Sequence, residues 1–104
     1  MDANGDPVKV IVTGDVDMAT VSEWAVRFDA AIADGAADVV ADLAAVTFID
    51  STGLSLLARI RTQLADQDRR LLLERPAACV TRLLALAGVE QHFAMHDLDD
   101  QPQP

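Results

Sequence analysis

Apolar and polar positions along this chain recur with two different periods. The first residues alternate, as in a strand with one buried face, whereas the stretch after Gly53 spaces leucine and isoleucine three and four positions apart, as in an amphipathic helix. The first helix is expected to begin near residue 20, with Thr20 or Ser22 as its cap. The pattern predicts strands over residues 8–13, 38–43, 70–74 and 93–95, and helices over about 20–34, 51–65 and 77–87. Such alternation predicts an α/β domain with parallel strand pairs.

The strand pattern gives way to the helix pattern between Phe48 and Leu54. The first turn of a helix has backbone N–H groups without partners, and a hydroxyl from Ser51 or Thr52 is expected to accept from them. The same N–H groups and the helix dipole favour a negative charge. Helix-start chemistry therefore accounts for both hydroxyls, and it also makes this junction tolerant of a phosphate.

Composition narrows the classes of protein that fit. A chain of 104 residues supports one core, so we expect a single domain. Apolar residues make up 51% of the chain and aromatic residues only 4%, which predicts a core of mainly Ala, Val, Leu and Ile. The 17 acidic and 8 basic residues give a formal net charge of −9, which argues against direct binding of nucleic acid because the phosphate backbone would repel the chain.

Few other residues suggest chemistry. Cys79 is the only cysteine, and its apolar helical surroundings favour a buried hydrophobe over a reactive thiol. His92 and His96 lack the neighbouring ligands of a zinc site. The sequence contains no hydrolase elbow, phosphate-binding loop or dinucleotide fingerprint. We therefore expect no enzymatic activity, no metal and no other cofactor.

The two ends of the chain are expected to lie outside the fold. Residues 1–7 lack the basic and apolar regions of a signal peptide, and no run approaches the ~18 apolar residues of a membrane span. This predicts a cytoplasmic protein that does not insert into membranes. We expect a disordered lead over residues 1–7, a folded domain over 8–96 and a flexible acidic, proline-containing tail over 97–104.

Three segments together resemble the STAS-domain family of anti-sigma-factor antagonists. Residues 48–54 resemble the hallmark of that family, which is a hydrophobic strand followed by Asp-Ser-Ser/Thr-Gly-Leu and a helix. Residues 10–17 resemble a strand that ends in Gly-Glu-Leu-Asp, with Asp15 in place of Glu and Val16 in place of Leu. Residues 76–89 resemble a later helix. The resemblance implies one STAS-type α/β domain, with a mixed but mostly parallel sheet of about four strands and about three helices.

The resemblance also implies a phosphorylation switch. Family members carry a phosphorylatable Ser directly after the motif Asp, which makes Ser51 the expected acceptor and Thr52 the less favoured one. Asp50 either positions that hydroxyl for a kinase or simply ends the strand and compensates the helix dipole. For Gly53, close packing of the helix is favoured over clearance for a partner. The expected partner-binding residues are Asp15, Asp17, Asp50, Ser51, Thr52, Gly53 and Leu54.

The partner implied by the resemblance is an anti-sigma factor that is also an ATP-using serine kinase. The unphosphorylated chain would bind it and release a sigma factor, phosphorylation of Ser51 would end binding, and a metal-dependent serine/threonine phosphatase would reset the switch. Two alternatives stay open. One is a small STAS subunit of a membrane lipid-transport ATPase complex, and the other is a redox or ligand sensor that uses Cys79 or an apolar cleft.

The chain departs from the family at both ends. Members usually have a short strand before the position of Val8 and a helix after the last strand, and both elements look shortened or absent in this sequence. A sheet edge that is normally covered would then be exposed. We therefore expect a monomer or a weak homodimer.

Overall fold

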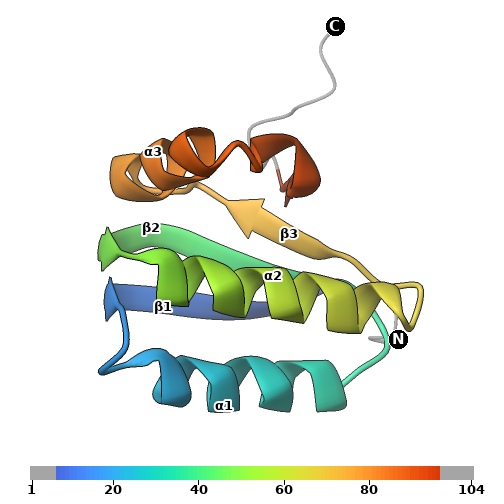
Figure 1. Ribbon diagram of the computed structural model, residues 1–104. Helices are drawn as coiled ribbons and strands as arrows, with labels where there is room; N and C mark the ends of the chain where they lie inside the picture. The colour runs from blue at the N-terminus through green and yellow to red at the C-terminus, as the bar shows by residue number, and fades with distance from the viewer. Residues whose placement is uncertain (1–6, 97–104) are drawn as a thin grey trace, which may run out of the picture.

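The computed structural model describes residues 7–96, which form a four-stranded sheet with three α-helices (Figure 1). In chain order the elements are β1 (Val8–Val16), α1 (Val21–Ala33), β2 (Val39–Ile49), α2 (Ser51–Ala65), β3 (Leu71–Glu74), α3 (Ala78–Ala87), the 3₁₀ turn η2 (Glu90–His92) and β4 (Ala94–Met95). The expected α/β architecture is confirmed, and all three strand pairs among the described residues are parallel. The expectations for residues 1–6 and 97–104 lie outside the described residues.

The order of the strands explains where the helices lie. The sheet runs β1-β2-β3-β4, so each strand lies beside the strand that precedes it in the chain. A helix that joins two parallel neighbours makes a right-handed crossover. Because the order never reverses, three such crossovers place α1, α2 and α3 on the same face of the sheet. Figure 1 shows α2 lying across β1 and β2 on this face.

One apolar core fills the space between this face and the helices. Every second residue of β1 from Val8 to Val12 faces it, and α1 contributes the stripe that the sequence predicts, with Trp24, Phe28 and Ile32 buried. The first half of β2 is buried throughout, as expected for a central strand. The largest fully buried apolar side chains of this core are Val12, Phe28, Val39, Leu43, Ile60, Leu64, Leu71, Leu73 and Val80.

β1 is longer than the sequence pattern predicts. A turn is expected over residues 14–17, but the strand continues to Val16 and stays paired with β2, Gly14 with Val46 and Val16 with Ile49. Gly14 has φ 74°, a conformation that glycine adopts without steric cost, so the strand bends there without ending. The register with β2 shifts on both sides of this bend. The predicted turn was therefore wrong.

The opposite face of the sheet carries a network of charged groups. Glu74 is fully buried, and its carboxylate oxygens lie 3.0 Å from Lys9 Nζ and 3.0 Å from His96 Nδ1. On the neighbouring strand Asp42 is also buried and accepts from Arg75 Nη2 at 2.8 Å and from the Ala44 backbone N–H at 3.1 Å. The network ties β1, β2, β3 and the end of β4 together.

This network predicts loss of stability in acid. Burial alone would raise the pKa of Glu74, but hydrogen bonds from Lys9 and His96 and the charge of Lys9 outweigh it, so that pKa lies below its ordinary 4.5. The pKa of Asp42 is likewise lowered from 3.8, because its bonds from Ala44 and Arg75 outweigh burial. Carboxyls with a lowered native pKa stabilise the fold above their unfolded pKa, and this stabilisation is lost as the pH falls through the native value.

We therefore expect the free energy of unfolding, measured by urea titration, to be nearly flat from about pH 7 to pH 5 and to fall steeply below about pH 4. The Glu74→Gln variant should be less stable near neutral pH and should show a shallower decline in acid. An equally steep acid decline in that variant would show that Glu74 is not responsible.

Candidate partner-binding site

The candidate site lies where β1 and β2 end and α2 begins. Asp15 is paired with Phe48 across the two parallel strands, and the Asp50 backbone N–H donates to the Val16 carbonyl at 3.3 Å. This bond brings the segment after β1 beside the first turn of α2. The structure therefore brings the expected residues Asp15, Asp17 and Asp50 to Leu54 to one edge of the sheet.

Asp50, and not a hydroxyl, caps α2. Its backbone is extended, and its carboxylate Oδ1 accepts from the N–H groups of Thr52 at 2.9 Å and Gly53 at 3.2 Å. The expectation that Ser51 or Thr52 would accept these bonds was wrong, because the residue before them already satisfies the N–H groups. The structural reading of Asp50, as the residue that ends the strand and compensates the helix start, is the one supported by these bonds.

The hydroxyl of Ser51 consequently has no role in capping the helix. It is the first residue of α2 and its side chain is exposed. Within residues 7–96 its hydroxyl makes no hydrogen bond, whereas Thr52 beside it is half-buried. The hydroxyl of Ser51 is thus the more accessible of the two, and it projects from a helix start whose backbone position is fixed by Asp50.

Gly53 is required by the close approach of α2 to the strand ends. A Cβ atom at this position would lie 2.7 Å from the Val16 carbonyl oxygen and 2.8 Å from side-chain carbons of both Val16 and Ile49. These distances are shorter than van der Waals contact, so any larger residue would push the helix away. The favoured sequence reading of Gly53, a small residue for close packing, is confirmed. Leu54 is only partly exposed, since it packs against the core.

The two aspartates at the end of β1, Asp15 within the strand and Asp17 directly after it, each have a local role. Asp15 is exposed and accepts from the Thr47 hydroxyl at 3.0 Å. Asp17 accepts at Oδ1 from the backbone N–H groups of Ala19 at 2.9 Å and Thr20 at 3.2 Å, which closes the turn into α1. Thr20 is the N-cap residue of α1, one of the two expected caps, but its hydroxyl donates to the Asp15 carbonyl at 2.8 Å and makes no capping bond to the helix.

Two apolar residues at this edge were missed by the sequence reasoning. Phe48 is 48% exposed and Met18 is 77% exposed. Phe48 was counted among the apolar residues of the strand, yet Ile49 next to it is buried in the core. Successive residues of a strand point to opposite faces, so the pair Phe48-Ile49 already indicates that one of the two lies outside. The edge therefore combines carboxylates with exposed apolar surface.

The remaining candidates lie away from this edge or serve the fold. Cys79 is partly buried with Sγ 3.6 Å from the Val46 carbonyl oxygen, which fits the predicted hydrophobe. His96 belongs to the Glu74 network. Across residues 7–96, no three His, Cys, Asp or Glu side chains are grouped so that they would hold a metal ion. The described part of the chain also contains no helix long and apolar enough to cross a membrane.

Comparison with known proteins agrees with this fold. The structure is similar to that of the anti-sigma factor antagonist SpoIIAA in its unphosphorylated form, with a TM-score of 0.70 over 89% of this chain and 80% of that chain, at 19% sequence identity. No curated protein sequence matches significantly. The family model of the STAS domain matches residues 1–100, nearly the whole chain. This chain therefore belongs to the STAS domain family.

Proposed function

We propose that this protein is an anti-sigma-factor antagonist that binds its partner at the edge formed by β1, β2 and α2, and that phosphorylation of Ser51 ends binding. The observation that carries the proposal is the exposed, unbonded hydroxyl of Ser51 at a helix start that Asp50 already caps. A hydroxyl without a structural role is available to a kinase, and its phosphorylation breaks no bond of the fold.

In the unphosphorylated state, the exposed surface of Phe48 and Met18 supplies apolar contact, and Asp15 supplies a carboxylate. An anti-sigma factor of the serine-kinase type that offers an apolar pocket rimmed by uncharged hydrogen-bond donors is complementary to this edge. Its capture releases the sigma factor. The place of action is then the cytoplasm, where the transcription machinery operates.

Phosphorylation adds negative charge to an edge that is already acidic. The phosphate adds roughly −1.5 to −2 charges at neutral pH, beside Asp50 and near Asp15 and Asp17. The start of α2 tolerates the phosphate locally because helix N-termini favour anions. The fold therefore keeps its shape, and the charge and bulk act on the bound partner. A serine/threonine phosphatase restores the binding form.

A binding module fits the site better than an enzyme. A nucleophilic serine needs a base within hydrogen-bond reach. The Ser51 hydroxyl contacts no such group among residues 7–96, and His96, directly after β4, is engaged by Glu74. The same hydroxyl is well placed as a substrate for another protein's active site.

The test is recovery of the protein from its host, with bound proteins and phosphorylated residues identified together by mass spectrometry. We expect phosphate on Ser51 in the wild type, no phosphate at this position in Ser51→Ala, and a kinase-like anti-sigma factor among the captured proteins. Ser55→Ala is the matched control, because Ser55 is an exposed serine one turn later on the same helix. Undiminished phosphorylation of Ser51→Ala, or capture of a transporter ATPase instead, would contradict the proposal.

A further inference from the structure

The outer edge of β1 is unpaired along its first half. β1 pairs with β2 on one side, and no strand among the described residues lies on its other side. The Val8 N–H donates to the Asp38 carbonyl, on the β2 side. Because the backbone groups of alternate residues point the same way, the N–H and C=O groups of Lys9, Ile11 and Thr13 point to the outer edge. The edge thus presents three residues for pairing.

The usual protection of such an edge is weak here. Natural edge strands are guarded by charged side chains, most often lysine, and by bulges or prolines. Lys9 is the one charged residue between Val8 and Thr13, but its ammonium is held 3.0 Å from the buried Glu74 carboxylate on the sheet face. Ile11, in the middle of the edge, is 57% exposed. An apolar residue therefore stands where a guarding charge is expected.

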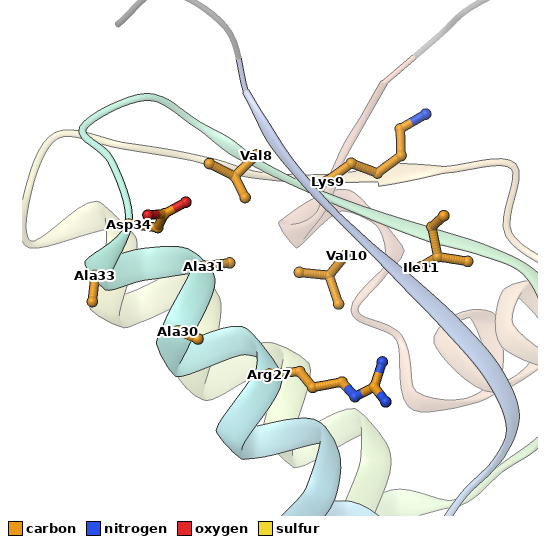
Figure 2. Close-up of a pocket in the computed structure, with 9 residues that line it drawn as sticks. All are labelled: Val8, Lys9, Val10, Ile11, Arg27, Ala30, Ala31, Ala33 and Asp34. Atoms are coloured by element: carbon orange, nitrogen blue, oxygen red, sulfur yellow. The ribbon is translucent and has the colours of Figure 1, made fainter. Parts of the chain in front are cut away.

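The space beside the edge is open. A cavity of about 790 Å³ lies between β1 and α1, lined among others by Val8, Val10, Arg27 and Ala30. Figure 2 shows Arg27 reaching from α1 toward β1, and Lys9 on the opposite side of the strand from Val10. Open space therefore lies along β1 on the side of α1.

We propose that the first half of β1 pairs with the same segment of a second copy of this chain, antiparallel and about a two-fold axis through Ile11. This register is fixed by the edge itself. A residue whose backbone N–H and C=O groups point outward must lie opposite another such residue. Ile11 therefore faces Ile11 of the second copy, and Lys9 faces Thr13. The three pairs exchange about six hydrogen bonds. The two sheets become one continuous sheet of both copies.

The edge is self-complementary in charge and in extent. In this register the single charged residue, Lys9, meets a neutral hydroxyl, so no like charges oppose each other, and the two exposed Ile11 side chains cover one another. The pairing segment ends after Thr13, because the strand bends at Gly14 and the Asp15 carbonyl already accepts from the Thr20 hydroxyl. A longer or shifted pairing would leave outward groups unpaired.

Two chains of net charge −9 repel each other at long range, which salt screens. We therefore expect a dimer that strengthens with salt, observed by sedimentation velocity as a concentration-dependent increase in mass. Ile11→Lys and Ile11→Glu should each weaken dimerisation at least tenfold, because the axis places two like charges together. Leu86→Lys is the control, since Leu86 is 78% exposed on α3, and it should dimerise like the wild type.

The decisive experiment mixes the two Ile11 variants, one of them isotope-labelled so that native mass spectrometry distinguishes the species. The two-fold axis through Ile11 sets lysine opposite glutamate in a mixed pair, so the heterodimer should recover most of the lost association. A wild type that stays monomeric at all concentrations overturns the proposal. So does a dimer that survives Ile11→Lys, or a mixture that recovers nothing while circular dichroism shows both variants folded.

Discussion

Ser51→Glu should weaken binding of the anti-sigma partner about a hundredfold. This loss corresponds to about 2.7 kcal/mol. One added charge about 6 Å from another of the same sign costs about 2.8 kcal/mol at an effective dielectric constant of about 20, but only about 0.7 kcal/mol at the value for water. The full effect therefore requires that the partner exclude water from the edge, which the exposed Phe48 and Met18 favour. Isothermal titration calorimetry with the purified partner measures it.

Two variants separate charge from bulk. Ser51→Gln has nearly the size of Ser51→Glu without its charge, and it should bind much closer to the wild type. Asp50→Asn removes a neighbouring charge while an asparagine still caps the helix, because Asn and Asp are similar caps. Combined with Ser51→Glu, it should recover part of the lost affinity. Equal losses for Ser51→Glu and Ser51→Gln would show that bulk, and not charge, controls release.

Gly53→Ala should lower the free energy of unfolding by about 2 kcal/mol, since overpacking a tight site costs about 1–3 kcal/mol. The added methyl would lie 2.7 Å from the Val16 carbonyl oxygen, a backbone atom that cannot rotate away. The clash is relieved only if α2 moves outward, and this movement also displaces Ser51. Thermal unfolding should show a Tm lower by about 10 °C, and phosphorylation by the kinase should slow.

Gly35→Ala is the matched control for this change. A Cβ atom at Gly35 would meet only Val8 Cγ2, at an ordinary contact distance of 3.7 Å. This variant should keep the wild-type Tm within a few degrees. A Gly53→Ala variant as stable as Gly35→Ala would mean that α2 has room to shift, and the close approach would then not explain the glycine.

The sequence predicts much of this fold because its apolar residues recur with clear helix and strand periods. The helices and strands follow the changes in apolar spacing, and the buried first half of β2 follows from an unbroken apolar run. The end of β1 was misplaced because Gly14 and Asp15 are typical turn residues. Pairing with Val46 and Phe48, far away in the chain, keeps this segment in the sheet. The pattern of neighbouring residues gives no information on contacts between segments that are far apart in the chain.

At the candidate site, the pattern placed the start of α2 correctly but assigned the capping role to the wrong residue. Both Asp50 and Ser51 are favourable caps, and residue type alone does not decide between them. The structure decides, because Asp50 has the extended backbone that aims its carboxylate at the Thr52 and Gly53 N–H groups. The Lys9–Glu74 ion pair joins residues 65 positions apart, and their spacing in the sequence gives no indication of it.

The sequential strand order also bears on how the chain folds. Each strand pairs with the strand made just before it. Each pairing of strands thus spans one crossover helix only, and folding rates rise as the average sequence separation of contacts falls. On a ribosome, β2 finds its partner β1 already made when it emerges. The chain is therefore suited to stepwise folding during synthesis, from its first strand to its last.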